Sequence, residues 1–405
     1  MSAESGDVRW APVGEVGEVR MGKQLSPTSK SAAGQMPYLR VANVFEGRID
    51  YGDVKTMGFS DVEKRIYELR PGDILLNEGQ ESLFNVGRSA IYEGGAGGFC
   101  FQNTLIRFRP SEHVLPEYAQ EVFVWWRRLG RFASVAEKTS ISHLGGNRFA
   151  AMSFPLIPMG QQRRIVDILG AIQENIKAEE EFLAKQDRLW GGVLNQELER
   201  HEKQYGSTPL RDVSRGGGSY GSNSPASPHR IGMPRYVRIT DIDEKGFLSP
   251  ADSGAASISE SAAARYLLGE GDLLIARTGY TTGKSYLYRP SDGPCAFAGY
   301  LVRFRIDPNQ MLPDYAFLWT SGNRFREWVS RNVREVGQRN ISAREFDDHE
   351  VAHPPLSVQR KLVEAAEAAR EARSLRMMEI NRLRTLRSAL ADALLKDSVG
   401  SQAIS

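Results

Sequence analysis

Apolar residues recur at steps of three, four and seven positions along residues 161–202, and polar residues fill the positions between them. This spacing predicts one long amphipathic helix whose apolar stripe forms a coiled-coil seam. No proline occurs between Pro158 and Pro209 to break it, and at about 1.5 Å per residue it would span about 60 Å. A single helix of this length needs a partner to cover its seam. The seam comprises Ile165, Leu169, Ile172, Ile176, Leu183, Trp190 and Val193.

A second stretch, residues 358–395, offers that partner. Its apolar positions superimpose on those of the first helix after a shift of about 197 residues. One such stripe alone is more typical of a helix that packs on a globular core, but two matching helices favour pairing with each other. We expect the packing to involve Ile165, Leu169, Ile172, Ile176, Leu183 and Trp190 of the first helix, and Leu362, Ile380, Leu383, Leu390 and Leu394 of the second.

The segments that precede the two helices also repeat. Five blocks of similar sequence keep nearly the same offset, which chance similarity would not do. Residues 37–44 match 235–242, 69–76 match 268–275, 87–92 match 283–288, 104–109 match 300–305, and 115–119 match 312–316. The chain therefore reads as a tandem repeat, in the order globular segment, helix, globular segment, helix.

Each globular segment mixes strands and helices. Short alternating or β-branched runs bounded by Gly, Pro and Asp predict strands and turns, and residues 105–108 and 301–304 alternate as half-buried strands do. A helix is expected after the proline in each unit, over residues 117–131 and 314–332. A Pro-rich extended stretch then leads into each long helix.

The predicted organisation has two globular domains at residues 1–160 and 206–357, long helices at 161–205 and 358–396, and a disordered tail at 397–405. The fold class is α/β of the mixed α+β kind. Similar helices that pair through similar faces tend to adopt two-fold pseudosymmetry. We therefore expect antiparallel helices with one globular domain near each end.

Composition adds little to this picture. The hydrophobic fraction of 41% and charged fraction of 25% are ordinary for a soluble protein, and the net charge of +2 gives no overall preference for nucleic acid. No apolar run of about 18 residues and no signal pattern occurs. Cys100 and Cys295 occupy matching places in the repeat, which favours core residues over a disulfide and predicts a reduced, cytoplasmic protein with no membrane contact.

Catalytic and metal-binding patterns are missing. Residues 279–285 resemble a phosphate-binding loop, but three residues separate the glycines where four are required, and no helical pattern follows. The six histidines and two cysteines have no metal-ligand spacing. Asp73 and Asp272 sit in Gly-Asp turns, where stabilising the turn is the better interpretation. The sequence thus predicts a non-enzymatic scaffold with two binding modules, no metal and no cofactor of its own.

Loops that combine cations, amides, hydroxyls and glycines are the candidate DNA-binding elements. Arg and Lys hold phosphates or guanine edges, and Asn and Gln read adenine. An ordinary solvated loop is an equal alternative for any single residue, but these loops vary between the repeats while the strands match. The candidates are Lys23, Asn77, Gln80, Arg88, Lys138, Ser140, Asn147 and Arg148 in the first domain, and Arg277, Tyr280, Thr281, Thr282, Lys284, Gln338, Arg339 and Asn340 in the second.

The starts of the two long helices resemble a known family. Residues 154–158 with 161–166, and residues 351–356 with 359–363, are similar to the conserved-helix starts of type I restriction–modification specificity subunits. Residues 71–75 and 271–274 are similar to the family's target-recognition domains. One departure is Val358-Gln359, where the family usually has Glu-Gln. The resemblance covers nearly the whole chain in the family's order.

The resemblance implies that each recognition domain reads one half of a split target in double-stranded DNA and that the helices fix the spacer. It also implies two adenine methyltransferase subunits as partners, which themselves bind S-adenosylmethionine, and it allows endonuclease/translocase subunits to join them. The alternative is a coiled-coil adaptor whose globular domains bind proteins and not DNA. A third hypothesis, an enzyme with an unrecognised site, has no motif in its favour.

Overall fold

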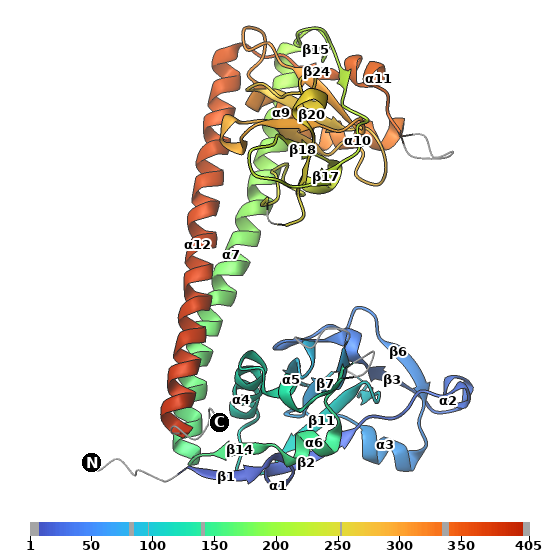
Figure 1. The fold of residues 1–405 in the computed structure, drawn as a ribbon, viewed down its shortest axis with the longest axis vertical. Coiled ribbons are helices and arrows are strands. Elements are labelled where there is room, and N and C mark those ends of the chain that lie inside the picture. Colours follow the sequence, from blue (N-terminus) through green and yellow to red (C-terminus); the bar gives the residue numbers. More distant parts are fainter. Residues whose placement is uncertain are drawn as a thin grey trace. The chain divides into compact units, whose positions relative to one another are not determined.

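The computed structural model describes residues 8–80, 85–95, 97–138, 142–251, 253–333 and 340–399. The chain divides into two compact units. The first unit comprises residues 1–179 and 379–405, and the second comprises residues 180–378. Each unit contains one mixed α/β domain and a part of each long helix (Figure 1).

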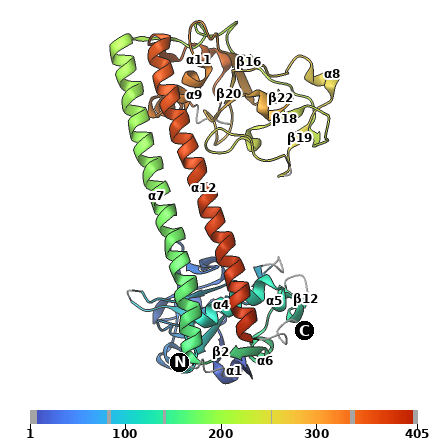
Figure 2. The ribbon, with the colours of Figure 1, turned by 90° about the vertical axis from the view of Figure 1, so that its left-hand side faces the viewer.

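The long helices are α7 (Met159–Tyr205) and α12 (Leu356–Val399). The first unit contains the start of α7 and the end of α12, whereas the second contains the end of α7 and the start of α12. Within each unit the two segments therefore pack antiparallel, as predicted (Figures 1 and 2). Helix α7 ends before Gly206, whose φ of 79° is the left-handed conformation that ends many helices. Helix α12 continues to Val399, so residues 397–399 of the predicted disordered tail (397–405) are helical. Residues 400–405 lie outside the described residues.

The helix seam follows most of the predicted positions. Ile165, Leu169, Ile176, Leu183, Leu362 and Ile380 are buried, and Ile172, Trp190, Leu383, Leu390 and Leu394 are partly buried. Val193 was wrongly placed on the seam, because it is 49% exposed. From Trp190 the buried positions step by four residues to Leu194 and Leu198, as a helix of 3.6 residues per turn allows. Ala391 and Leu395 are the buried residues near the end of α12.

A four-stranded antiparallel sheet with the same strand order forms the centre of each domain. In the first domain the order is β2 (Gly17–Met21), β11 (Leu105–Pro110), β7 (Ile74–Asn77), β9 (Ser89–Ile91). In the second domain it is β16 (Ser219–Tyr220), β23 (Leu301–Arg305), β20 (Asp272–Ala276), β21 (Ser285–Leu287). The strand repeat inferred from the sequence is therefore also a repeat of sheet topology.

Strands β11 and β23 are almost fully buried and not half-buried as predicted. Ile106 and Phe108 belong to the core shared with α4 and α7, while Leu105 belongs to a second core on the other face of the sheet. In the second domain, Val302 and Leu301 divide between two cores in the same way. Burial on both faces thus removes the exposed side that alternation suggested.

The smaller sheets complete the two domains. The first domain has the orders β10-β3-β6, β12-β13-β8, β1-β14 and β4-β5, and the second has β17-β19-β18-β22 and β15-β24. Their bounds are β1 (Arg9–Pro12), β3 (Gln35–Leu39), β4 (Val44–Phe45), β5 (Arg48–Ile49), β6 (Lys55–Gly58), β8 (Gly79–Gln80), β10 (Cys100–Phe101), β12 (Glu137–Lys138), β13 (Ser142–His143), β14 (Ser153–Leu156), β15 (Ser207–Pro209), β17 (Ser227–Pro228), β18 (Arg235–Val237), β19 (Ala256–Ser257), β22 (Cys295–Phe297) and β24 (Glu350–Ala352).

Short helices lie around these sheets. Their bounds are α1 (Val13–Val16), α2 (Pro27–Ser31), η1 (Val41–Asn43), α3 (Asp61–Tyr67), α4 (Pro116–Arg128), α5 (Arg131–Val135), α6 (Gly146–Ala151), η3 (Ile239–Asp241), α8 (Glu260–Ala263), η4 (Pro290–Asp292), α9 (Pro313–Ser321), α10 (Asn323–Asn332) and α11 (Ala343–Asp347). No helix in the described part of the chain combines the length and the apolar character that crossing a membrane requires.

The helix predicted at 314–332 is two helices, α9 and α10, because the chain breaks at Gly322. A Cβ atom at Gly322 would lie 2.8 Å from Leu198 Cδ1 of α7, so the break allows a close approach to the long helix. The side-chain Oδ1 of Asn195, also on α7, accepts a hydrogen bond of 2.7 Å from Asn323 N at the start of α10. Contact with α7 thus decides where this helix is interrupted.

A buried glutamine fixes each domain to the start of its long helix. Gln162 of α7 donates to the carbonyls of His113 and Ile157, at 2.9 Å each, and accepts from the N–H of Leu115 at 2.9 Å, just before α4. Gln359 of α12 accepts at 2.8 Å from the N–H of Leu312, just before α9. Both side chains are fully buried, so the same glutamine contact links the domain to its long helix in both repeats.

Two expectations about buried residues are confirmed. Asp73 accepts from the N–H of Arg70 at 2.8 Å, and Asp272 accepts from the N–H of Gly269 at 3.0 Å, so both stabilise their turns. Cys100 and Cys295 are buried free thiols, and burial raises the pKa of each to about 12.

Candidate nucleic-acid interface

The buried central strands β7 and β20 end at equivalent points, and a charged residue follows each. In the first domain Glu78 N–H donates to Thr104 O at 3.0 Å, and Leu144 N–H donates to Glu78 O at 2.8 Å. Arg277 occupies the matching place in the second domain. Its N–H donates to Tyr300 O at 3.0 Å, and Ile341 N–H donates to its carbonyl at 2.9 Å. The same pattern of backbone hydrogen bonds thus presents a carboxylate in one domain and a guanidinium in the other.

Glu78 pairs with a histidine. Its Oε2 lies 2.8 Å from Nδ1 of His143, which stands on the neighbouring strand β13. Glu78 is largely buried, whereas His143 is partly exposed. An Nδ1 proton shared with the carboxylate fixes the orientation of the imidazole ring.

Arg277 stacks on an aromatic ring. Its guanidinium carbon lies 4.6 Å from the ring centroid of Tyr220, whose hydroxyl accepts from the N–H of Ala343 at 3.0 Å. Asn340 lies next to Arg277 through a β-bridge to Thr278. Arg277 Nε and Asn340 Oδ1 are buried and have no hydrogen-bond partner in the described part of the chain. Stacking holds the guanidinium plane in place while leaving hydrogen-bonding capacity unused.

Several predicted residues of the first domain have structural contacts instead. The ammonium group of Lys23 donates to Gly58 O at 2.8 Å and pairs with Glu63 at 2.8 Å. Asn77 is fully buried and donates to Val44 O at 3.4 Å. Both side chains therefore already have partners within the fold.

The other candidates of the first domain lie nearer its surface. Arg88 bonds Asn85 Oδ1 at 2.5 Å and is partly buried. Asn147 and Arg148 are exposed at the start of α6, and Arg148 pairs with Glu137 at 3.1 Å. Backbones of Gln80 and Lys138 lie in β8 and β12, next to β13. The side chains of Gln80 and Lys138, and all of Ser140, Gln338 and Arg339, lie outside what the structure describes.

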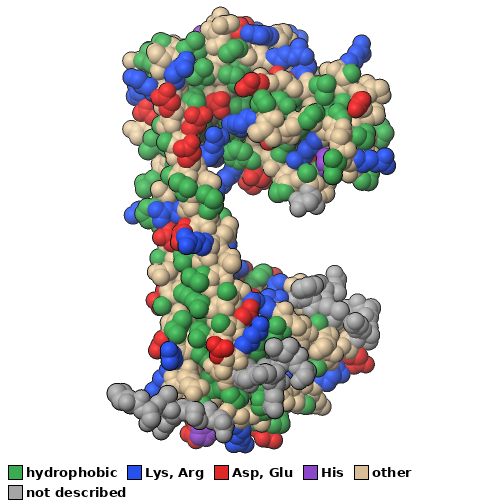
Figure 3. Space-filling view, turned by 60° about the vertical axis from the view of Figure 1, so that its left-hand side comes forward, with side chains coloured by type: hydrophobic (Ala, Val, Ile, Leu, Met, Phe, Trp, Pro, Cys, Tyr) green, Lys and Arg blue, Asp and Glu red, His purple; other side chains and the backbone are tan. Residues whose placement is uncertain are grey.

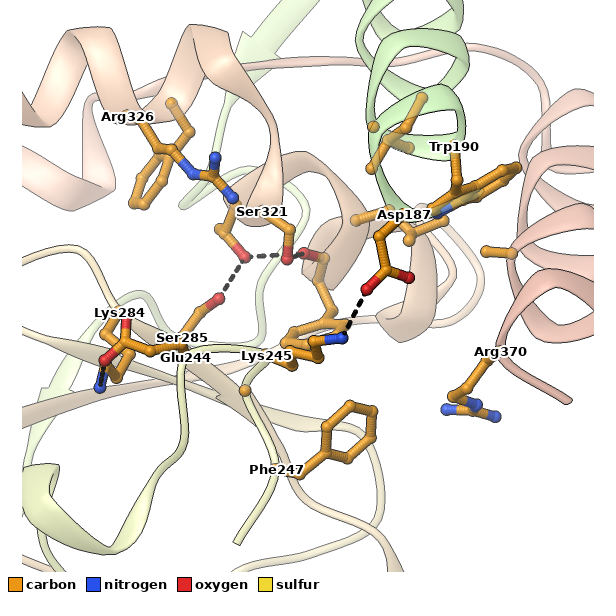
Figure 4. Close-up of a pocket in the computed structure, with 18 of the residues that line it drawn as sticks. Asp187, Trp190, Glu244, Lys245, Phe247, Lys284, Ser285, Ser321, Arg326 and Arg370 are labelled. Carbon is orange, nitrogen blue, oxygen red and sulfur yellow. Dashed lines mark hydrogen bonds and ion pairs between the residues drawn. The ribbon is translucent and has the colours of Figure 1, made fainter. Parts of the chain in front are cut away.

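Part of the predicted loop of the second domain lines a cavity of about 980 Å³ between the domain and the second unit's segments of α7 and α12. The loop residues that line it are Tyr280, Thr281, Thr282 and Lys284. Lys284 donates to Glu244 Oε1 at 2.7 Å (Figure 4) and to Ile242 O at 3.2 Å, so its ammonium group already has two partners within the domain. Strand β21 follows this loop, and not the helix of a phosphate-binding loop.

The same cavity contains an ionic link between the domain and both long helices. Asp187 of α7 pairs with Lys245 of the domain at 3.1 Å (Figure 4). It also pairs with Arg373 of α12 at 3.2 Å. Burial raises the pKa of Asp187, but the hydrogen bonds from both cations outweigh it, and the net pKa is lowered. Apolar walls come from Trp190, Phe317 and Val363, among others.

The first unit has ion pairs at its domain–helix contact. Arg387 of α12 bonds Glu121 of α4, and Arg128 of α4 bonds Asp392 of α12 at 2.9 Å. Burial raises the pKa of Glu121, although Arg387 opposes this shift.

Arg387→Met is expected to destabilise the first unit by about 2 kcal/mol. Breaking a fully buried ion pair costs about 3–5 kcal/mol of stability. The expected loss is smaller here because both side chains keep some exposure to solvent. The loss should be smaller at pH 5.5 than at pH 8, since the unpaired Glu121 takes up a proton. Denaturant unfolding at both pH values measures it, with the exposed Arg382→Met as control. An equal loss in the two variants would contradict a specific role for the pair.

Positive and negative side chains are mixed on one face of the described part of the molecule. On the face drawn in Figure 3, Lys and Arg side chains are interspersed with Asp and Glu. Among the described residues, no group of three or more His, Cys, Asp or Glu side chains could hold a metal ion.

The sequence analysis did not select several residues of the candidate interface. Glu78, His143, Tyr220 and Tyr300 were not among the candidates, although aligning the blocks 104–109 and 300–305 already places Thr104 opposite Tyr300. The contact between Tyr220 and Arg277 joins residues far apart in the chain. A pattern read along the sequence carries no signal for such a contact.

Comparison with known proteins agrees with this architecture. Residues 7–185 match the family model of the type I restriction modification DNA specificity domain. The chain is 22% identical, over 365 residues, to the type I restriction enzyme EcoKI specificity subunit of Escherichia coli (strain K12), which covers 82% of this chain and 75% of that protein.

Two solved structures share the fold. One is the S subunit of a type I restriction–modification system from M. genitalium, with a TM-score of 0.50 and 12% identity over 97% of this chain and 98% of that one. The other is described as addressing complex assembly and conformational transition of the type I R-M system, with a TM-score of 0.61 and 14% identity over 97% and 99%.

The architecture of two similar α/β domains with a pair of long helices, together with the matched domain, is that of a DNA-specificity protein. Residues 7–185 match the DNA specificity domain, and the chain is similar over most of its length to a member of the family of type I restriction–modification specificity subunits. Subunits of this family are non-catalytic and have no catalytic cofactor of their own.

Proposed function

We propose that each α/β domain reads one half of a bipartite target in double-stranded DNA. The observation that carries this proposal is the pair of equivalent positions described above. One scaffold, with one strand order, presents Glu78 and His143 in the first domain and Arg277 with Tyr220 in the second. Reading two different half-sites requires different polar groups at the same point of a shared backbone arrangement.

The proposed DNA-contacting set differs from the one that the sequence suggested. It omits Lys23, Asn77 and Lys284, whose polar atoms the fold already uses. It adds Glu78, His143 and Tyr220. From the original candidates it keeps Gln80, Arg88, Lys138, Ser140, Asn147, Arg148, Arg277, Tyr280, Thr281, Thr282, Gln338, Arg339 and Asn340.

The long helices would set the spacer between half-sites. We propose recognition domains at residues 1–160 and 206–357, joined by helical regions 161–205 and 358–396, in a pseudo-two-fold arrangement with one domain near each end. Two adenine methyltransferase subunits, which themselves bind S-adenosylmethionine, would dock on the helices, and endonuclease/translocase subunits could join in the cytoplasm. Relatives named as parts of type I systems support these partners.

The spacer proposal can be tested by lengthening both helices. Seven residues inserted after Glu179 of α7 and seven after Met378 of α12 keep the seam in register, and both sites lie where the two compact units meet in the sequence. At about 1.5 Å per residue the insertion adds about 10 Å, or about three base pairs of 3.4 Å. Long-read methylation mapping with the partner methyltransferase should show longer spacing and unchanged half-sites.

The control carries the seven-residue insertion in α7 alone, which should disrupt the pairing and abolish methylation. Unchanged spacing in the double insertion would refute the spacer proposal. A wild-type chain that directs no sequence-specific methylation would instead favour the protein-binding adaptor.

A further inference from the structure

We propose that Glu78 and Arg277 are the specificity-determining residues of the two domains, and that they read a cytosine and a guanine respectively. This inference rests on the proposed function and names the bases for one position of each half-site. The backbone hydrogen bonds at this position are the same in both domains. The carbonyl of each residue accepts from a later segment of the chain, and its N–H donates to the carbonyl of the residue just before strand β11 or β23. Each side chain therefore leaves the scaffold at an equivalent point.

The two side chains have opposite hydrogen-bonding character. An ionised glutamate only accepts hydrogen bonds, whereas an arginine only donates them. In the major groove, guanine presents two acceptors, O6 and N7, which fit the two-pronged guanidinium. Cytosine presents the N4 amino donor, which fits a carboxylate. Adenine also has an amino group, but its neighbouring N7 acceptor would face the same negative charge.

The surroundings of Arg277 indicate an unfilled binding position. Its Nε and the Oδ1 of Asn340 are buried without a hydrogen-bond partner among the described residues. Such groups cost free energy unless a ligand satisfies them. The stack on Tyr220, which is itself held through its hydroxyl by Ala343 N–H, fixes the guanidinium before DNA arrives. Preorganisation of this kind favours a bidentate contact over a loose phosphate contact.

The side chain of Glu78 is also held in one orientation, by a histidine and not by a tyrosine ring. His143 Nδ1 lies 2.8 Å from one carboxylate oxygen, which holds the side chain in one orientation. Because Glu78 is largely buried, little solvent competes with a base for the carboxylate. The partly exposed imidazole beside it lies at the edge of the same site.

The test uses the full-length chain co-expressed with its methyltransferase partner and long-read mapping of the methylated motif. The variants are Glu78→Gln and Arg277→Lys, which keep size or charge but change the hydrogen-bonding pattern. Arg277→Lys should reduce discrimination for one guanine about 10- to 100-fold in one half-site. Glu78→Gln should shift one cytosine toward adenine in the other half-site, since an amide pairs with adenine.

Matched controls are Glu112→Gln and Arg265→Lys, which are exposed in the same two domains and should leave the motif unchanged. Should either test variant lower the unfolding temperature, His143→Gln and Tyr220→Leu probe the same positions through the neighbouring side chain. Motif changes confined to one position and one half-site per variant support the proposal.

Three outcomes would overturn it. The first is a wild-type motif in which either half-site lacks a G·C base pair, since a cytosine on one strand pairs with a guanine on the other. The second is a motif that the variants leave unchanged, which would overturn this inference but keep the two-domain reading of DNA. A wild-type chain that yields no bipartite motif would remove the proposed function and this inference together.

Discussion

Gln162→Leu is expected to destabilise the first unit by about 4 kcal/mol. Leucine fills nearly the same volume but removes the hydrogen-bond partner of the Leu115 N–H and of the carbonyls of His113 and Ile157. Each lost hydrogen bond and stranded polar group costs about 1 kcal/mol or more. Against a typical domain stability of about 5–15 kcal/mol, this is a large fraction.

The measurement is hydrogen exchange by mass spectrometry in increasing denaturant, read separately for the two units. Protection should fall in α4 and the start of α7, and remain in the second domain. Gln359→Leu is the matched variant and should produce the same loss around α9 and the start of α12. Gln173→Leu, on an exposed face of α7, is the control. Loss of protection in both units from one substitution, or in neither, would show that the glutamine does not fix its own domain.

Acid is expected to destabilise the second domain through His349, by about 2 kcal/mol at pH 5 and about 3 kcal/mol at pH 4. Burial lowers the pKa of His349 to about 4. Its Nε2 accepts from Trp319 Nε1–H at 3.0 Å, so the folded state needs the neutral ring. The unfolded chain, whose histidine titrates near 6.5, takes up the proton first. Stability is therefore lost as pH falls below 6.5.

Urea unfolding between pH 7.5 and pH 5, followed in the second domain, measures this loss. His349→Gln keeps an acceptor for Trp319 but does not titrate, so its stability should vary less over the same range. The residual slope would come from His201, whose pKa burial also lowers, and from carboxylates. A variant with the same pH dependence as the wild-type chain would rule out His349 as the main source.

The candidate DNA-contacting loops show how much a pattern read along the sequence can predict. Loops rich in Arg, Asn, Thr and Gly were recognised as candidates, and Arg277 was among them. Lys284 comes from the same loop, but a backbone turn directs it to Glu244 beside the long helices. Residue type and spacing do not encode that turn's direction, because it depends on contacts with segments about 40 residues earlier.

The sequence by itself determined the duplication, the two long helices and the mixed α/β character of each domain. These features depend on periodicity and on blocks that recur along the chain, which are local properties of the residue order. The tertiary structure alone decided the break at Gly322, the burial of Arg107 in β11, and the pairing of Glu78 with His143. Each of these depends on the approach of distant segments, where close packing and the need to satisfy buried polar groups override local preference.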